Sequence, residues 1–495
     1  MNFVQMMTEK DTLTENGALT NSTTHNYCLD LFFQAGACRN QSVEEIEELL
    51  DKAYAFDALK TKKIIFWAGD IRQGAGERRF FKIALNWLSK HHPNDIQNNL
   101  DNIPEFSRWD VIFDLAIDNE ILFSYLIMCL SNPESKNHGL LCKWLPRQTS
   151  VRDVHKYTDT HGDVSKTTVT RKKRILYKGL ADKLRKRLGI SAKEYRKLVV
   201  EGSKTVEQQM SDNKWNEIEY KSVPSVAMNK YRQAWYRHDK ERFEQYLEDV
   251  KSGKSTMNAG AIFPHDIISD AIGYQHVGTL TESQMVQWKQ LPNWLSGTNK
   301  ILPICDTSGS MTWENNALAM KISLALGLYI SERNEGIFKD AVMTFSTEPK
   351  FHYLSGNLNQ RCAQLMKGTE SGSTDIEKVF HVILHKAIQN NLPQNEMPET
   401  VLIISDMQFN QGTSGTNTTH EVIEKMYAQS GYRAPHIVYW NVNGRSNYPI
   451  TTNDYGAGLI SGTSPSILKA VLANKLDPVD MMDSVIETER YNNIR

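Results

Sequence analysis

The chain has 495 residues, which is enough for two to four domains and a large buried core. Its formal net charge is −1, so the chain as a whole is not a general polyanion-binding protein, and no stretch approaches the roughly 18 apolar residues of a membrane-spanning helix. The first residues lack the basic start and apolar core of a secretory signal peptide, and the six cysteines include no Cys-x-x-Cys pair. We therefore expect a cytoplasmic protein with reduced thiols.

Helical periodicity dominates the sequence before about residue 290. Ser42 and Glu45 have the spacing of a capping box, and Ile46, Leu50 and Ala53 then fall on one helix face. Further apolar stripes at helical spacing cover residues 64–67, 80–88, 111–115, 121–130 and 176–188. Several helices of about 10–15 residues joined by short breaks predict an all-helical repeat domain of HEAT-like type over residues 1–295.

A glycine-rich turn, Gly74-Ala75-Gly76, interrupts this pattern between Arg72 and the pair Arg78 and Arg79. It lacks the third glycine of a dinucleotide fingerprint and the Lys-Ser/Thr of a P-loop. Two interpretations stay open. In the first, the glycines end one helix and Glu77 begins the next. In the second, the three arginines beside a helix N-terminus hold a phosphate.

Positive charge is concentrated between Lys143 and Lys197, where seventeen Lys and Arg residues stand against five Asp and Glu, a net of +12. Such a local excess predicts binding of RNA or another polyanion, and a solvated helix face is the alternative. Interspersed aromatic residues could stack on unpaired bases: Trp144, Tyr157, Tyr177 and Tyr195. The candidate phosphate contacts are Lys143, Arg147, Arg171, Lys172, Lys173, Arg174, Arg185, Lys186 and Arg187. Residues 153–170 have no helical period and predict a flexible insertion within this basic segment near 143–200.

The pattern changes after residues 292–298, the expected junction between two domains. From 299 to 495, strand-like and helix-like segments alternate, which predicts a parallel sheet covered by helices on both faces, a doubly wound α/β domain. The expected strands cover residues 301–305, 340–345, 401–405 and 436–442, and the expected helices cover 315–332, 375–390, 418–429 and 465–475.

Oxygen-bearing side chains gather at the ends of these elements. Asp306, Ser308 and Ser310 follow the first strand in one tight turn, Thr374 precedes a later helix, and Asp406 ends another buried strand. Because the carboxyl ends of parallel strands share one edge of a sheet, we expect these side chains to meet. Carboxylate and hydroxyl oxygens suit Mg²⁺, Mn²⁺ or Ca²⁺ better than softer metals. The sequence therefore predicts one divalent cation site.

These five residues resemble the metal-ion-dependent adhesion site of von Willebrand factor A domains, whose signature is Asp-x-Ser-x-Ser with a later Thr and a later Asp. The resemblance implies that Ser308 and Ser310 bind the metal directly. Asp306 and Thr374 would contact it through water, with Asp406 close by. We expect the adjacent Asp375 to supply helix N-terminal charge rather than to bind the metal.

Three phrases in the N-terminal half, at residues 14–18, 72–79 and 103–110, carry a second resemblance. Together with the C-terminal pattern they resemble an uncharacterised family of two-domain proteins from plants, viruses and phages, which is similar in turn to the TROVE-type Ro ribonucleoproteins. In those proteins a ring of helical repeats is closed by a von Willebrand factor A domain, and RNA binds in the hole of the ring and on its outer face. The resemblance implies an RNA partner, single-stranded or structured.

We expect binding rather than catalysis. A phosphatase of the haloacid dehalogenase type would need a second Asp where Ser308 stands, and the fourteen histidines form no His-Glu-x-x-His pattern. The leading hypothesis is a non-catalytic RNA-binding scaffold with a divalent-metal ligand site. Two alternatives stay open. One is a protein-interaction module, such as a virion component or chaperone adaptor, whose metal binds an acidic side chain of a partner. The other is a metal-dependent phosphoesterase.

Overall fold

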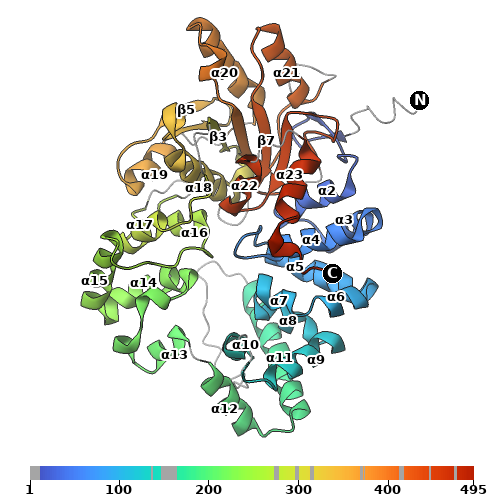
Figure 1. Cartoon of the computed structure of the whole chain (residues 1–495), viewed down its shortest axis with the longest axis vertical. Coiled ribbons are helices and arrows are strands. Elements are labelled where there is room, and N and C mark those ends of the chain that lie inside the picture. The colour runs from blue at the N-terminus through green and yellow to red at the C-terminus, as the bar shows by residue number, and fades with distance from the viewer. Residues whose placement is uncertain are drawn as a thin grey trace. The chain divides into compact units, whose positions relative to one another are not determined.

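The computed structural model describes residues 12–134, 138–146, 164–203, 205–272, 278–295, 300–312, 317–367, 372, 374–411, 417–444, 447–472 and 477–495 (Figure 1). The chain forms two compact units, one of residues 1–84 and 220–494, the other of residues 85–219 with residue 495. Helices that precede residue 295 are therefore divided between both units, and a HEAT-like repeat stays a prediction. All six cysteines are free, as expected for reduced thiols.

The unit of residues 85–219 is helical throughout its described part. Ser191 and Glu194 form the capping box that starts α12, with the Glu194 amide donating to Ser191 Oγ at 3.2 Å. Apolar faces then pack α8 on α9 and α10 on α12, burying Phe113 and Leu126 completely. The α-helices are α6 (Pro93–Asn98), α7 (Asn102–Phe106), α8 (Trp109–Ala116), α9 (Glu120–Leu130), α10 (His138–Trp144), α11 (Val164–Arg187), α12 (Ala192–Gly202) and α13 (Val206–Ser211), and α5 (Arg78–His91) ends in this unit.

Helix α11 corrects one expectation. The sequence predicts no helix over 153–170, yet α11 already begins at Val164. Residues 164–170 are mostly Thr, Val and Ser, which have low helix propensity and form no apolar stripe, so periodicity gives no signal there. Helix formation is cooperative, and the Lys-, Arg- and Leu-rich segment that follows extends the helix backwards. Residues 153–163, Arg147 and Tyr157 lie outside the described residues.

Helices also make up most of the other unit before residue 295. The capping box predicted for α3 is present, since the Glu45 amide donates to Ser42 Oγ and the Ser42 amide donates to Glu45. A small hairpin, β1 (Thr12–Leu13) with β2 (Leu19–Thr20), precedes them. The helices are α2 (Tyr27–Ala35), α3 (Val43–Phe56), α4 (Ala58–Gly69), α14 (Ser225–His238), α15 (Lys240–Lys251), α16 (Pro264–Ile268) and α17 (Glu282–Lys289).

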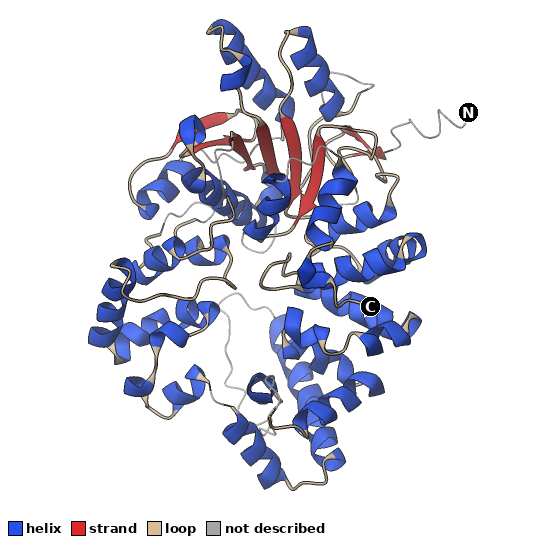
Figure 2. Cartoon of the chain, in the orientation of Figure 1, coloured by secondary structure: helices blue, strands red, loops and turns tan. Residues whose placement is uncertain are grey.

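The same unit contains a six-stranded sheet in the order β5-β4-β3-β6-β7-β8. Figure 2 draws its strands in red, with helices around them. Its strands are β3 (Ile301–Asp306), β4 (Ala341–Phe345), β5 (Lys350–Tyr353), β6 (Thr400–Ser405), β7 (His436–Asn441) and β8 (Ala457–Ser461). Five strands are parallel, but β5 pairs antiparallel with β4. The prediction of a parallel sheet is therefore wrong at this edge, because β4 and β5 are joined by a short hairpin rather than by a helical crossover.

Helices cover the sheet and explain why its central strands are buried at every position. Helix α18 packs on β3, β4 and β6, while α2 and α23 pack on β8. A side chain at Gly327 of α18 would come within 2.2 Å of Cys305 Sγ, so glycine permits the close packing of α18 on β3. The helices of this part are α18 (Leu318–Arg333), α19 (Leu358–Met366), α20 (Ile376–Gln389), α21 (Thr419–Gln429), α22 (Leu468–Leu472) and α23 (Pro478–Ile486).

The strand order also positions a site. From β3 the chain continues to β4 on one side of the sheet, whereas β6 lies on the other side of β3. The crevice beyond the carboxyl ends of two such strands is the usual ligand site of a doubly wound sheet. Asp306 ends β3, and Asp406 follows the last residue of β6. The topology therefore brings together the strand ends that carry the two predicted carboxylates.

Candidate functional site

Asp306 lies at the centre of the predicted cation site. Its side chain is fully buried, and the Ser308 amide donates to its Oδ1 at 2.9 Å. The Ser405 hydroxyl donates to its Oδ2 at 2.5 Å. Both hydrogen bonds favour the ionised form of the carboxylate and fix its orientation at the end of β3.

The two serines of the motif face each other in the turn that follows. Ser308 Oγ and Ser310 Oγ are 3.3 Å apart, and a short 3₁₀ turn over Gly309–Met311 holds them. The Gly309 amide donates to the Gly372 carbonyl at 3.0 Å, which connects this turn to the loop that carries Thr374. The turn thus presents two hydroxyl oxygens beside a carboxylate.

Asp406 is the second buried acid of this cluster. Burial, together with the negative charge of Asp406, raises the pKa of Asp306 to about 7. Two carboxylates that repel each other inside a protein favour either a shared proton or a cation. Among the described residues, no group of three or more His, Cys, Asp and Glu side chains is placed to hold a metal. The candidate set has only two acids with hydroxyls beside them, a donor set that fits a hard cation such as Mg²⁺.

A series of hydrogen bonds positions Thr374 and extends to the N-terminal segment. Its amide donates to Asn410 Oδ1 at 3.0 Å, and the Asn410 amide donates to its carbonyl at 2.9 Å. The Thr14 hydroxyl and the Asn16 amide group donate to the carbonyls of Phe409 and Gln408, each at 2.6 Å. Residues 14–18 therefore support the loop after β6.

Asp375 takes the position expected of it. It is the N-cap of α20, and its carboxylate accepts from the Lys378 amide at 3.0 Å. A carboxylate that satisfies the first turn of a helix also offsets the partial positive charge of that helix end. The prediction that Asp375 serves the helix is confirmed.

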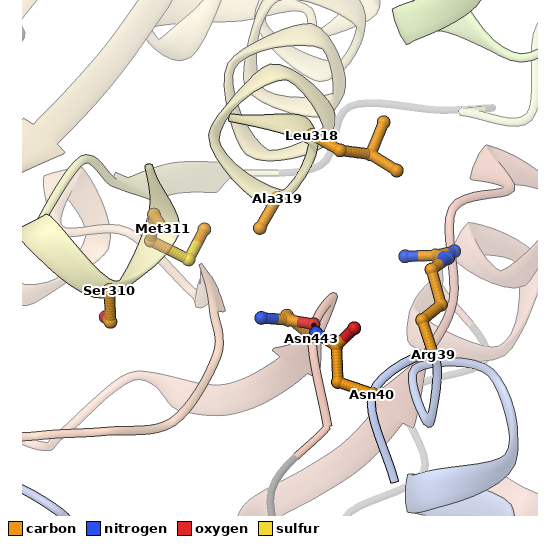
Figure 3. Close-up of a pocket in the computed structure, with 7 residues that line it drawn as sticks. All are labelled: Arg39, Asn40, Ser310, Met311, Leu318, Ala319 and Asn443. Carbon is orange, nitrogen blue, oxygen red and sulfur yellow. Dashed lines mark hydrogen bonds between the residues drawn. The ribbon is translucent and has the colours of Figure 1, made fainter. Parts of the chain in front are cut away.

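A small cavity adjoins Ser310 (Figure 3). It is lined by Arg39, Asn40, Ser310, Met311, Leu318, Ala319 and Asn443. Ser310 and Met311 lie on one side, and Arg39 and Asn40 lie across from them with Asn443 between. Its volume of about 10 Å³ is roughly the space that one water needs. The Arg39 guanidinium pairs with Glu77 at 3.0 Å and donates to the Val442 carbonyl at 3.1 Å. These contacts fix its position in the lining of the cavity.

The glycine-rich turn of residues 74–76 is tightly built into its unit. The Ala75 and Glu77 amides donate to the carbonyls of Trp67 and Ala68, and a side chain at Gly74 would lie 1.9 Å from the Trp67 carbonyl oxygen. The Glu77 carboxylate accepts from the Arg79 amide at 3.2 Å, and this negative charge disfavours an anion at the start of α5.

The three arginines around this turn do not form one cluster of exposed cations. Arg79 donates to the Cys38 carbonyl at 3.1 Å and is half-buried. Arg78 is half-buried as well, whereas Arg72 is exposed. These contacts favour the structural interpretation of the turn, and phosphate binding by these arginines stays a prediction.

Basic side chains on the helices of residues 85–219 fall into two groups. Some are engaged: Lys143 pairs with Glu207 at 3.1 Å, Arg187 with Glu120 at 3.5 Å, and Arg185 donates to the Ile190 carbonyl at 3.3 Å. Others are exposed, and among the described residues they have no ion-pair partner: Lys178 and Lys186 on α11, with Lys193 and Arg196 on α12. The side chains of Arg171, Lys172, Lys173 and Arg174 lie outside the described part of α11.

The interspersed aromatic residues differ in their exposure. Tyr195 is 1% exposed and donates to the Pro146 carbonyl at 3.0 Å, so the prediction that it stacks on bases is wrong. Tyr177 is half-buried and donates to Asp114. Trp144 is half-buried too, with the Arg108 guanidinium 4.1 Å from its ring centre. Trp144 therefore remains the best-placed stacking residue of the three.

Two residues that support the candidate site were not predicted from the sequence. Ser405 precedes the predicted Asp406 and looks like an ordinary strand residue, yet its hydroxyl holds Asp306. Asn410 stands in a polar loop without a distinctive spacing, yet it fixes the backbone of Thr374 on both sides. A small polar residue at the end of a buried strand was the one available signal for Ser405.

Comparison with known proteins gives two family matches. The family described as a domain of unknown function (DUF2828) matches residues 14–112 and 115–298. A second domain of unknown function (DUF7788) matches residues 300–493. In the described part of the chain, every helix is too short or too polar to span a membrane.

Two individual proteins are similar over nearly the whole chain. The uncharacterized protein L728 of Acanthamoeba polyphaga mimivirus is 27% identical, covering 96% of this chain and 87% of the viral protein. The crystal structure of the Ro (RSR) protein of Deinococcus radiodurans aligns with a TM-score of 0.43 and 13% identity, covering 94% of this chain and 100% of that one. Because the DUF2828 match covers more than half of the sequence, this protein belongs to the DUF2828 family.

Proposed function

We propose that this protein is a non-catalytic RNA-binding scaffold whose contact surface lies on α11 and α12. The observation that carries the proposal is the group of exposed cations Lys178, Lys186, Lys193 and Arg196, which have no acidic partner among the described residues. Phosphate neutralisation by such cations, with release of counterions, dominates nucleic-acid affinity. The net charge of +12 over residues 143–197 supports the same reading.

The proposed RNA contains unpaired residues. Trp144 with Arg108 against its ring offers a flat surface within the same unit. Bases in a duplex are already stacked on each other, whereas a loop or single strand leaves a base free to stack on an aromatic ring. Single-stranded RNA should therefore bind more tightly than a duplex of equal length.

The cation site forms the second part of the proposal. Ser308, Ser310, Thr374 and the two acids would hold Mg²⁺, or Mn²⁺ or Ca²⁺ in its place. The bound ion would offer one position to a ligand oxygen, from a phosphate or a carboxylate. Arg39 lines the cavity beside Ser310, where its guanidinium is paired with the Glu77 carboxylate.

The test neutralises the four unpaired cations together, as Lys178→Gln, Lys186→Gln, Lys193→Gln and Arg196→Gln. Affinity for a fluorescently labelled single-stranded RNA is measured by anisotropy across a salt series. Each lost phosphate contact should lower the log–log salt slope by about 0.7, so four contacts should lower it by nearly 3. Affinity should fall more than tenfold at low salt.

A matched variant controls for net charge. Lys240, Lys254, Lys386 and Lys425 are exposed and lie in the other compact unit, so their replacement by Gln removes the same charge elsewhere. This control should bind RNA with an almost unchanged slope. Equal slopes for wild type and the α11–α12 variant would reject the proposed surface and favour the alternative, a protein adaptor that binds an acidic side chain through its metal.

A further inference from the structure

A second, larger cavity lies away from the serine turn in the unit of residues 1–84 and 220–494. Its volume is about 480 Å³. Sites for small organic molecules are commonly about 300–1,000 Å³, so this space is large enough for a nucleotide. It is lined by Gln73, Trp294, Ser466, Ile467, Lys469, Ala470, Ser484, Val485, Thr488, Glu489, Arg490 and Tyr491.

Two of the lining residues combine a flat ring with a cation. The Lys469 ammonium lies 4.5 Å from the centre of the Trp294 ring, and the Trp294 amide donates to the Tyr329 hydroxyl at 3.1 Å. Lys469 is exposed, and no acidic group pairs with it within the described part of the chain. A ring with an ammonium over it, and no acid paired with that ammonium, suits a ligand that carries an aromatic plane and a negative charge.

Other lining residues are held by contacts with Asp70 and with the glycine-rich turn. Asp70 is fully buried and accepts from Arg490 at 2.8 Å and from the Tyr491 hydroxyl at 3.1 Å. The Ser466 hydroxyl donates to the Gln73 carbonyl at 2.9 Å, which connects the lining of the cavity to the glycine-rich turn. The turn that the sequence singles out thus shapes a cavity. Because Asp70 neutralises Arg490, Lys469 is the cation left to meet a ligand.

We propose that this cavity binds one nucleotide, with its base against Trp294 and its phosphate at Lys469. Glu489 can accept a hydrogen bond from a ribose hydroxyl or a base amino group, and its charge disfavours ligands with many phosphates. This inference deepens the proposed function, since an unpaired RNA residue is a nucleotide. A free mononucleotide has the same chemistry, and the experiment separates the two sources.

The test measures binding of AMP to the full-length protein by calorimetry. Lys469→Glu reverses the charge at the phosphate, and Ser484→Trp fills part of the cavity with a large side chain. Each should weaken AMP binding at least about tenfold, because a charge-assisted contact or the space itself is lost. The matched Lys386→Glu, an exposed lysine of α20 outside the cavity, should change binding less than about twofold.

A single-stranded hexanucleotide then identifies the source. Displacement of AMP by the hexanucleotide assigns the cavity to an unpaired RNA residue, and failure to displace it assigns the cavity to a free nucleotide. Absence of AMP binding in the wild type, or equal binding by all variants, overturns the proposal. The fourfold α11–α12 variant should bind AMP normally, so a failure of the proposed RNA surface leaves a different signature.

Discussion

The buried cluster around Asp306 and the exposed basic surface of α11 and α12 use charge in opposite ways. In the cluster, two fully buried acids lie at adjacent strand ends, and hydrogen bonds from Ser308 and Ser405 hold Asp306. On the helices, thirteen Lys and Arg residues stand against three Asp and Glu over residues 164–203, and several cations have no partner among the described residues. Buried charges depend on geometry and respond to metal and pH, whereas exposed charges respond to salt.

The largest expected effect is the loss of metal binding, which should depend on the Asp306 cluster and not on the basic surface of α11 and α12. Asp306→Ala should abolish Mn²⁺ binding measured by calorimetry, because it removes a central carboxylate of the cluster. Asp375→Ala is the matched control, since Asp375 caps α20 and should leave Mn²⁺ binding in place. RNA affinity should be nearly the same in wild type and Asp306→Ala. Unchanged Mn²⁺ binding in Asp306→Ala would show that the cluster is not the metal site.

A second experiment measures how folding stability depends on pH, whereas RNA binding depends on salt. Burial lowers the pKa of His436, the first residue of β7, to about 4. An unfolded chain takes up this proton near pH 6.5. The contribution of His436 to the free energy of unfolding is therefore complete above that pH and is lost as the pH falls towards 4. At pH 5 the loss is about 2 kcal/mol.

In His436→Gln the midpoint of thermal unfolding should therefore decrease less between pH 7 and pH 5 than in wild type. The exposed His381 of α20 provides a control, because His381→Gln should leave that decrease unchanged. Salt should have little influence on the difference between these variants, in contrast to RNA binding. The same decrease in wild type and His436→Gln would mean that this half-buried histidine does not control acid stability.

The smallest expected effect is a local loss of stability in α12, one of the two helices of the basic surface. Ser191→Ala removes the side-chain cap of α12 and should destabilise that helix by about 1 kcal/mol. Hydrogen exchange in the first turn of α12 should become faster, and RNA affinity should fall only slightly because the cations remain. Ser42→Ala makes the same change in α3 and should leave exchange in α12 unaltered. A large loss of RNA affinity in Ser191→Ala would mean that helix geometry, rather than charge, governs the surface.

Local chain geometry made much of the candidate site predictable. Asp306, Ser308 and Ser310 are close in sequence, so a strand followed by a turn is enough to bring them together. Asp406 followed from the rule that parallel strand ends share an edge. Asn410 did not follow, because its role depends on contacts with Thr374 and, through its loop, with residues 14–18.

The missed elements have weak local signals. β5 has four residues with alternating exposure, and β8 has five with a glycine near its start, so neither gives a clear apolar run. Tyr195 was misjudged for a related reason, since sequence shows an aromatic residue among cations but not which helix face is buried. Both errors concern tertiary packing, which the spacing of residue types does not report.

The most direct measurement is photo-cross-linking of a 4-thiouridine-containing single-stranded RNA to the full-length protein, with the cross-linked peptides identified by mass spectrometry. The proposed surface predicts cross-links in peptides from residues 138–146 and 175–203, and their loss in the variant that neutralises Lys178, Lys186, Lys193 and Arg196. A further cross-link near Trp294 would agree with the nucleotide cavity. Cross-links that avoid α10, α11 and α12 and persist in that variant would contradict the central claim.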